Sequence, residues 1–312
     1  MTPFPETAWD VRPLTAQVQP EAARAYRAQM VAAGHAPRSA TPQARRVAGV
    51  AGLGMVGLCA IVTLFFGFSA LVTFLLDELA AAGWNLLVTL GVGAVTVVLI
   101  ARLARRDEDD HWLRLARFAQ VNGFGYVPAA PPPVGGALVA FARTGELTDL
   151  VWIPSARAHI ANYSFRDGDF SDGIERTFGY VALELRIARA HALLRSRRSP
   201  LNNDRVPLPG RWQRVERRFT EEFSLHVPAG VRTSATPGEH LDPGFLTALA
   251  TELTMSGLPV ELVEVQGRWL LIGVREPMST LEPARWLHLQ QLLGRISHAD
   301  AHLRPHTHRE LA

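Results

Sequence analysis

Two long apolar blocks dominate the hydrophobic pattern in the first third of the chain. Residues 47–76 run for thirty positions without a charged side chain, and residues 84–101 for eighteen. A membrane-spanning helix needs about 17 to 25 apolar residues, at a rise of about 1.5 Å per residue. The pattern therefore predicts a transmembrane hairpin over residues 47–103, with spans at about 47–76 and 84–101.

The charges that flank these blocks predict the orientation of the hairpin. Arginines stand outside both blocks, at Arg38, Arg45, Arg46, Arg102, Arg105 and Arg106. The turn between the blocks carries two acidic residues and no basic residue. Because positively charged flanks stay on the cytoplasmic side, we expect a multi-pass protein of a bacterial cytoplasmic (inner) membrane, with both termini cytoplasmic and the lipid bilayer as a partner.

Mostly small residues recur at steps of three and four positions along the first block. They are Gly49, Gly52, Val56, Ala60, Thr63 and Gly67. Such a helix face lets another helix approach closely in a membrane. It fits packing between the two predicted spans and also contact between two copies of the chain, so a homo-oligomer stays open.

The rest of the chain divides into three parts. Residues 1–46 contain six prolines and little apolar periodicity, which predicts a mobile arm with one short helix at 20–33. Residues 104–297 are expected to form a cytosolic α+β domain. Residues 298–312 are expected to form a His-rich tail.

The pattern within the cytosolic part predicts a mixture of helices and alternating strands. Helices are expected at 107–121, 243–256 and 284–297, and strands at 159–165, 177–187, 191–194, 223–227, 260–265 and 269–274. The last two strands, separated by Gln266-Gly267-Arg268, predict a hairpin. The expected fold class is therefore α+β, with a two-helix transmembrane hairpin followed by a soluble, mostly antiparallel sheet and flanking helices.

This order of segments resembles a bacterial family known mainly as a domain of unknown function. The matching stretches are VNGFGYVP, HIANYSF before FGYVALELR, HALLRSRRSPLNND, VERRFTEEFSLHVPAG and FLTALATELTMSGLPVELVEVQGRWLLIGV. They fall within residues 107–274, nearly the whole cytosolic part. The resemblance implies an N-terminal transmembrane hairpin followed by a cytosolic α+β domain, and it implies no catalytic residue.

The composition excludes several kinds of chemistry. All 32 basic residues are arginine, which excludes lysine-dependent phosphate loops, kinase-type lysine sites and Schiff-base catalysis. Complete replacement of lysine by arginine also indicates GC-rich bacterial coding. The single cysteine, Cys59, excludes disulfides within the chain and multi-thiolate zinc sites. We predict no cofactor.

Basic charge gathers between residues 186 and 218, where ten arginines stand against two acidic residues. The candidates for contact with an anionic surface are Arg195, Arg197, Arg198, Arg211, Arg214, Arg217 and Arg218. Near anionic lipid headgroups each would contribute about 1 kcal/mol. The alternative is that they pair with surface carboxylates. Aromatic residues are sparse among them, which argues against nucleic acid as a partner.

Histidines gather at the C-terminal end. His298 and His302 are four residues apart, as two ligands on one helix face would be, and His306 and His308 follow. Pro305 would interrupt a helix between them, and a polar His-rich tail is usually solvated. We therefore predict no metal site, and name these four histidines as the candidates if a metal binds.

These patterns support one leading hypothesis and one alternative. The sequence contains no GxSxG elbow, no paired-carboxylate motif and no phosphate loop. We expect a non-enzymatic, membrane-anchored cytosolic domain that binds an unidentified protein partner or the membrane leaflet. The alternative is a membrane-tethered, hydrolase-like enzyme, which a concave pocket with convergent histidine and acidic side chains would favour.

Overall fold

The computed structural model describes residues 8–37, 107–140, 145–166, 175–198, 212–216, 219–229 and 241–302. The chain divides into two compact units. One comprises residues 1–17, 28–39 and 112–312, and the other comprises residues 18–27 and 40–111. The predicted spans at 47–76 and 84–101, with their small-residue face, lie outside the described residues.

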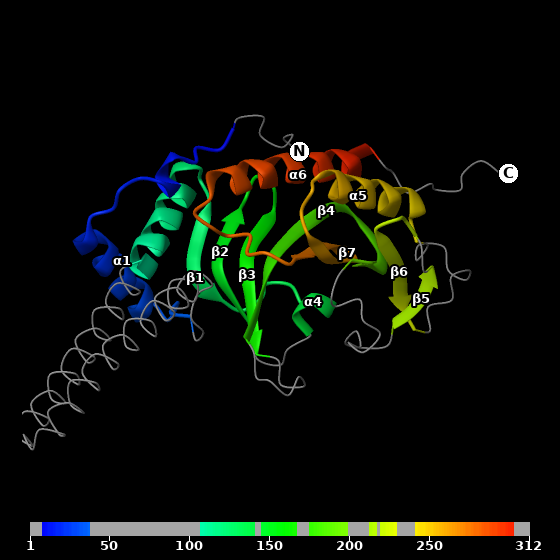
Figure 1. Cartoon of the computed structure of the whole chain (residues 1–312), viewed down its shortest axis with the longest axis horizontal. Coiled ribbons are helices and arrows are strands. Elements are labelled where there is room, and N and C mark those ends of the chain that lie inside the picture. Colours follow the sequence, from blue (N-terminus) through cyan, green and yellow to red (C-terminus); the bar gives the residue numbers. More distant parts are fainter. Residues whose placement is uncertain are drawn as a thin grey trace, which may run out of the picture. The chain divides into compact units, whose positions relative to one another are not determined.

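An antiparallel sheet is the main feature of the first unit (Figure 1). Among the described residues it has seven strands: β1 (Gly125–Ala130), β2 (Glu146–Ile153), β3 (Ala158–Arg166), β4 (Glu175–Ser196), β5 (Trp212–Glu216), β6 (Phe223–Pro228) and β7 (Val260–Val274). The order is β1-β2-β3-β4-β6-β5, and β7 pairs with β4. Every pair is antiparallel, which confirms the predicted α+β class.

The strand β7 folds back on itself. A straight strand of 15 residues would extend about 50 Å. The backbone N–H of Arg275 instead donates to the carbonyl of Pro259 at 2.9 Å, so the two ends of β7 lie side by side. The reversal falls at Gly267, whose φ of 58° is readily adopted only by glycine. These are the two strands and the turn that the sequence predicts.

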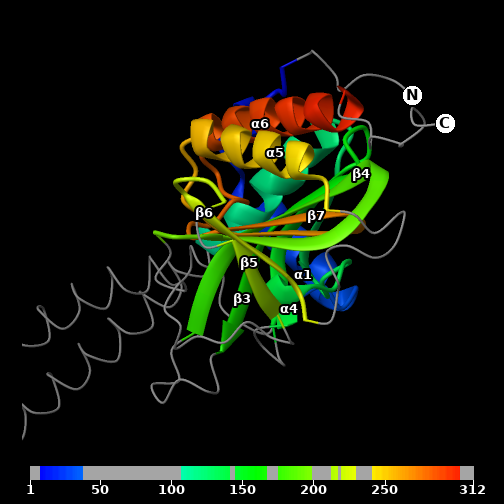
Figure 2. The same cartoon turned by 90° about the vertical axis from the view of Figure 1, so that its right-hand side faces the viewer.

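The long strand β4 follows this reversal and bends with it (Figure 2). Residues 179–184 pair with 269–274, and residues 192–195 pair with 262–265. The pairing register shifts on both sides of Arg189, the one residue between these segments that pairs with β7. The sequence predicts two separate strands, at 177–187 and 191–194, where the structure has one strand with an irregular bend.

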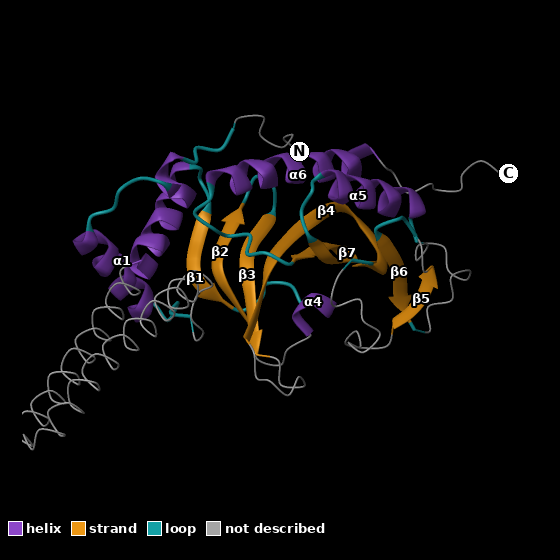
Figure 3. Cartoon of the chain, in the orientation of Figure 1, coloured by secondary structure: helices purple, strands orange, loops and turns teal. Residues whose placement is uncertain are grey.

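Helices cover one face of the sheet (Figures 1 and 3). They are α5 (Pro243–Met255), α6 (Pro283–His302) and residues 112–121 of the helical segment 107–121. Alternate residues of β4, among them Val181 and Leu183, pack against Leu249 of α5 and Leu289 of α6 in one buried cluster. This two-layer packing is what the alternating strands and amphipathic helices predict.

The opposite face carries a second apolar cluster, which includes Tyr163 of β3 and Leu271 of β7. The short helix α4 (Ala137–Ala140) joins it. The buried carboxylate of Glu264 accepts the backbone N–H of Ala137 at 2.5 Å and contacts Nε2 of His191 at 2.7 Å. This face of the sheet therefore also carries a hydrogen-bonded imidazole–carboxylate pair, in which the carboxylate is buried and the imidazole is partly exposed.

Part of the predicted N-terminal arm is packed into the first unit. Trp9 is buried and its ring lies 5.3 Å from that of Phe124. The backbone N–H of Asp10 donates to Asn122 Oδ1 at 2.8 Å, and Asn122 Nδ2 donates to the Asp10 carbonyl at 3.0 Å. Leu14, in a 3-10 turn at Arg12–Leu14, has no exposed surface. Residues 8–14 are thus held by burial and by reciprocal hydrogen bonds.

The helix predicted at 20–33 is present as α1 (Pro20–Ala32). Pro20 occupies its first position and Glu21 its first turn, as helix starts favour. Gly34 follows with a φ of 79°. In the second unit, Nη1 of Arg27 lies 2.7 Å from Asp109 and 3.1 Å from Glu108.

The segment after β7 is tied to β3 by one buried amide. The Oδ1 atom of Asn162 accepts the backbone N–H groups of Met278 at 2.8 Å and Ser279 at 3.1 Å. Its Nδ2 donates to the Ser279 carbonyl at 2.8 Å. The side chain of Met278 also lies where a Cβ on Gly179 would stand. Asn162 therefore binds the backbone of this segment, and Gly179 leaves space for its Met278 side chain.

The expected transmembrane hairpin and the multi-pass membrane location need correction. In the ranges that the structure describes, no helix combines the length and apolar character needed to cross a membrane. The helix α5 has 13 residues, or about 20 Å, and α6 has 20 residues but carries Arg285 and Arg295. The α+β class fits, whereas the described residues contain no two-helix span.

Candidate functional site: a pocket at the bend of beta 4

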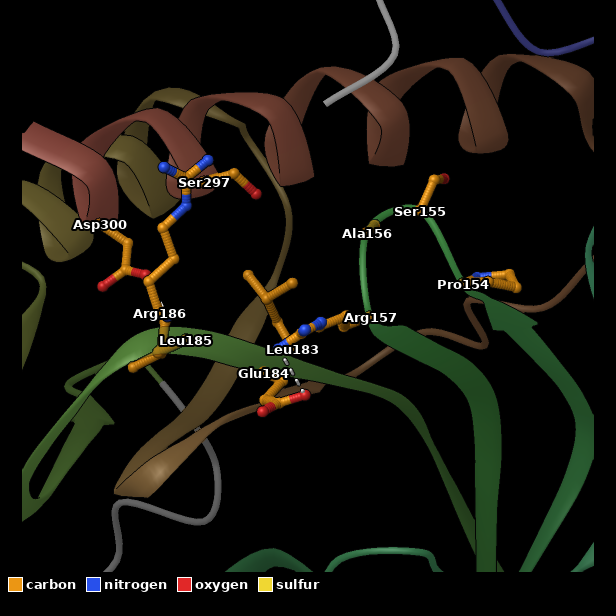
Figure 4. Close-up of a pocket in the computed structure, with 10 residues that line it drawn as sticks. All are labelled: Pro154, Ser155, Ala156, Arg157, Leu183, Glu184, Leu185, Arg186, Ser297 and Asp300. Carbon is orange, nitrogen blue, oxygen red and sulfur yellow. Dashed lines mark hydrogen bonds and ion pairs between the residues drawn. The ribbon is translucent and has the colours of Figure 1, made fainter. Parts of the chain in front are cut away.

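A pocket of about 230 Å³ lies beside the bend of β4 (Figure 4). Three elements form it: the turn between β2 and β3, the middle of β4, and the C-terminal part of α6. The lining residues are Pro154, Ser155, Ala156, Arg157, Leu183, Glu184, Leu185, Arg186, Ser297 and Asp300. The volume suits a small molecule or one chemical group of a larger ligand, because pockets for drug-sized ligands occupy about 300–1,000 Å³.

The bend leaves β4 backbone groups that need partners other than a neighbouring strand. Between residues 184 and 192, β4 pairs with neither β3 nor β6. The N–H of Glu184 donates to the Arg157 carbonyl at 3.1 Å. The N–H of Arg186 donates to Asp300 Oδ2 at 2.6 Å. Residues from the turn and from α6 thus satisfy the strand at its bend, as buried backbone groups require.

The Asp300 carboxylate is part of a buried ionic network. Its Oδ1 accepts Nη2 of Arg189 at 3.0 Å, and Nη1 of Arg189 contacts Asp242. The side chains of Arg189 and Asp300 are 4% and 3% exposed. Asp242 also caps α5, since its Oδ1 accepts the N–H of Phe245 at 2.9 Å, and the Arg189 guanidinium lies 3.8 Å from the Phe245 ring centroid. The charge on Asp300 is therefore compensated within the protein.

The second carboxylate of the pocket, Glu184, lies between two arginines. Its Oε2 is 3.3 Å from Arg157 Nη1 and its Oε1 is 3.3 Å from Arg268 Nη2. Arg268 Nε also donates to the Leu185 carbonyl at 3.2 Å. Arg157 adopts a φ of 50°, a conformation that non-glycine residues rarely adopt and that turns the chain into β3.

The charged residues of the lining and their ion-pair partners together carry a positive charge. Four arginines (157, 186, 189 and 268) meet three carboxylates (184, 242 and 300), which leaves an excess of one positive charge. Arg186 is exposed, and among the described residues no carboxylate pairs with its guanidinium. Figure 4 shows this side chain reaching from β4 toward α6, beside Ser297. A cationic group with hydrogen-bond donors therefore faces the pocket.

The lining does not have the composition of a hydrolytic site. Among the described residues that line it are two hydroxyls, on Ser155 and Ser297, and no imidazole or thiol. The paired imidazole and carboxylate of His191 and Glu264 belong to other parts of β4 and β7 and do not line this pocket. A nucleophilic serine needs a base within hydrogen-bond reach. The pocket is suited to binding an anion.

The arginines predicted to contact an anionic surface have different environments. Arg195 is buried. Nη1 of Arg197 donates to the Glu221 carbonyl at 3.0 Å, and the exposed Arg198 pairs with Glu222 at 2.8 Å. Arg214 is exposed on β5 and interacts with other residues. Arg211, Arg217 and Arg218 lie outside the described residues. None of the seven lines the pocket.

The predicted histidine candidates do not form a described cluster. His298 is exposed on α6 and His302 ends that helix, while His306 and His308 lie outside the described residues. No group of three or more metal-ligating side chains is found in the part of the chain that the structure describes. The prediction for these four histidines therefore stays a prediction.

Sequence reasoning missed the pocket residues. Arg186 belongs to the basic stretch but is not among the seven predicted contact residues, and no motif singles out Arg157 or Asp300. These three residues come from three elements that are far apart in the sequence. The available signal is the irregular break in alternation after Arg186, which marks the bend but not the turn and the helix that reach it.

Comparisons with known proteins do not identify a ligand for this pocket. No family model matches the chain, and no curated protein matches it. Among solved structures, it is similar to the mycobacterial trehalose monomycolate transport factor A, TtfA, at 13% sequence identity. That match covers 61% of this chain and 94% of the other, with a TM-score of 0.36. A likeness this weak says nothing about function.

Proposed function

We propose that this protein is a non-enzymatic binding protein whose α+β domain holds an anionic group in the pocket at the bend of β4. One observation carries the proposal. The pocket carboxylates, Glu184 and Asp300, already have arginine partners, and the exposed Arg186 guanidinium faces the pocket. An incoming anion would therefore meet a positive charge that no described carboxylate neutralises.

The chemistry of arginine supports an anion as the ligand. A guanidinium presents a planar set of N–H donors that matches carboxylate and phosphate oxygens. Hydrogen bonds to charged groups contribute about 1.5–3 kcal/mol each. The apolar wall supplied by Leu183 and Leu185 strengthens such contacts, because it replaces water with a medium of lower dielectric constant. Removing one arginine should weaken binding by about 10- to 100-fold.

Isothermal titration calorimetry of the full chain tests this proposal. Acetate, citrate, sulfate and inorganic phosphate are titrated into the wild type and into Arg186→Ala and Arg157→Ala. The matched control is Arg24→Ala, which removes an exposed arginine of α1 that pairs with Glu21. We expect both pocket variants to weaken the binding of at least one anion by tenfold or more, while the control does not.

Two outcomes would refute the proposal. In one, no anion binds the wild type. In the other, Arg186→Ala and Arg24→Ala alter the affinity equally, which would mean that the ions respond only to overall charge. Circular dichroism of each variant confirms that the fold is kept, because both pocket arginines are exposed and their truncation removes little buried surface.

A further inference from the structure

We infer that the group held in this pocket is a tetrahedral, doubly charged oxyanion of the phosphoryl type and not a carboxylate. This inference rests on the proposed function and specifies its ligand. The pocket offers donors from three elements: Arg157 and Ser155 from the turn, Arg186 from β4 and Ser297 from α6. A phosphoryl group presents three strong acceptor oxygens, whereas a carboxylate presents two in one plane.

The placement of these donors suits a tetrahedral acceptor. In Figure 4, Arg186 extends upward from β4 and Ser297 lies above the strand, while Ser155 and Arg157 stand on the turn across the pocket. Arg157 runs from that turn toward Glu184 (Figure 4). Donors from three elements thus line one pocket, and a planar group bound edge-on to one arginine would leave some of them unused.

The charges behind the lining do not oppose a bound anion. Glu184 and Asp300 would repel an anion if they were unpaired, but arginines contact both of them. Arg189 and Asp300 are almost completely buried, so this compensation does not depend on a ligand. Arg186 carries the charge that remains, and Arg157 has only a long contact of 3.3 Å with Glu184. Both guanidinium groups can turn their other N–H donors toward the pocket.

The phosphoryl group could be free inorganic phosphate or the terminal group of a phosphomonoester. Both present the same dianion, and they differ in the substituent on one oxygen. The pocket volume of about 230 Å³ exceeds the space that one phosphate needs, which leaves room for a small substituent. The test below therefore includes both sources.

Calorimetric titration of the full chain at pH 7.5 tests the inference with four probes: inorganic phosphate, glycerol 3-phosphate, dimethyl phosphate and acetate. We expect phosphate or its monoester to bind at least tenfold more tightly than acetate and than dimethyl phosphate, which carries a single charge. Tighter binding of glycerol 3-phosphate than of phosphate would identify a monoester as the ligand. Tighter binding of phosphate than of glycerol 3-phosphate would identify the free ion.

Variants of the donors supply the second readout. Ser297→Ala should weaken phosphate binding three- to tenfold and leave acetate binding unchanged. The Ser297 hydroxyl would donate to the third oxygen of a phosphoryl group, which a carboxylate lacks. Ser279→Ala, which removes the hydroxyl of a serine that does not line the pocket, is the control. Arg186→Lys keeps the positive charge but removes the planar set of guanidinium N–H donors, so it should weaken phosphate binding by at least fivefold.

The outcomes separate this inference from the proposed function. If acetate binds as tightly as phosphate and both depend on Arg186, the protein binds anions and the phosphoryl inference is wrong. The same conclusion follows if Ser297→Ala affects the two anions equally. If no probe binds, or if binding does not depend on Arg186, the proposed function fails as well.

Discussion

Replacing Arg189 with methionine should destabilise the protein by about 3–5 kcal/mol. The Arg189 side chain is 4% exposed and contacts Asp300, which is 3% exposed, and Asp242. Methionine fills a similar volume but leaves the Asp300 charge buried with only the backbone N–H of Arg186 as a described partner. Removing one member of a buried ion pair costs about 3–5 kcal/mol, because the uncompensated charge stays behind. Domains are stable by only about 5–15 kcal/mol.

Urea unfolding followed by tryptophan fluorescence measures this effect, since Trp286 is fully buried in the same unit. The matched control is Arg268→Met, which removes a half-exposed arginine that pairs with Glu184 and should cost about 1 kcal/mol or less. A double-mutant cycle with Asp300→Asn isolates the pair. Asparagine still accepts from the Arg186 N–H, so the double variant should be at least about 2 kcal/mol more stable than additivity predicts.

Two results would contradict this reasoning. If Arg189→Met costs no more than Arg268→Met, the buried network does not stabilise the bend of β4. If the effects of Arg189→Met and Asp300→Asn simply add, the two charges do not interact in the folded protein. Either result would also remove the compensation that keeps Asp300 from repelling an anionic ligand.

Three further changes test other parts of the fold. Asn162→Ala should cost about 3 kcal/mol in urea unfolding, because three hydrogen bonds at about 1 kcal/mol each are lost, and a cost under 1 kcal/mol would contradict their role. Gly179→Ala should lower the thermal midpoint, since the new Cβ would lie 2.5 Å from the Glu276 carbonyl oxygen; Gly244→Ala, with a nearest contact of 3.4 Å, should not. Burial lowers the pKa of His159, so its stabilising contribution is present above its usual pKa of about 6.5 and is lost as pH falls through the lowered value. The decline in urea midpoint below pH 6.5 should therefore be smaller in His159→Phe, and an unchanged decline would exclude this histidine as its source.

Elements with strong local signals could be predicted from the sequence. The helix α5 begins where Asp242 and Pro243 predict, with Asp242 accepting the N–H of Phe245, and it ends before Gly257 at a φ of 68°. The hairpin in β7 could be predicted because Gly267 stands between two runs of alternating apolar and polar residues. In both cases a residue at the boundary supplies a conformation or a cap that few other residues can supply.

Strands without a regular alternation were missed. The strand β1 contains Pro128, which is tolerated at the edge of a sheet but weakens the sequence pattern. In β2, Asp149 has a φ of 55° and lies where the register with β3 shifts between Thr148 and Val151. Such a bulge changes which side chains face the core, so the period of two is lost. The strand β5 has two apolar residues, Trp212 and Val215, which are three positions apart and do not alternate.

Tertiary packing holds part of the N-terminal arm that the sequence predicts to be mobile. Proline content and weak periodicity predict mobility, yet Trp9 and Leu14 are buried. Two isolated apolar residues give no periodic signal in the sequence. They are buried because residues far along the chain form the site that they occupy. Trp9 contacts Gln290 and Trp286 of α6, about 280 residues later. A composition-based prediction cannot detect such a contact.

The pocket follows from the same bend that interrupted the sequence pattern. A regular strand would have its backbone groups satisfied by neighbouring strands, whereas at the bend Asp300 and the Arg157 carbonyl take that role. Placing a carboxylate there requires a buried cation, and Arg189 supplies it. The backbone and charged groups at the bend are therefore paired without the Arg186 guanidinium, which faces the pocket. Stability and binding should therefore separate: changes at Arg189 should act mainly on unfolding, and changes at Arg186 mainly on anion affinity.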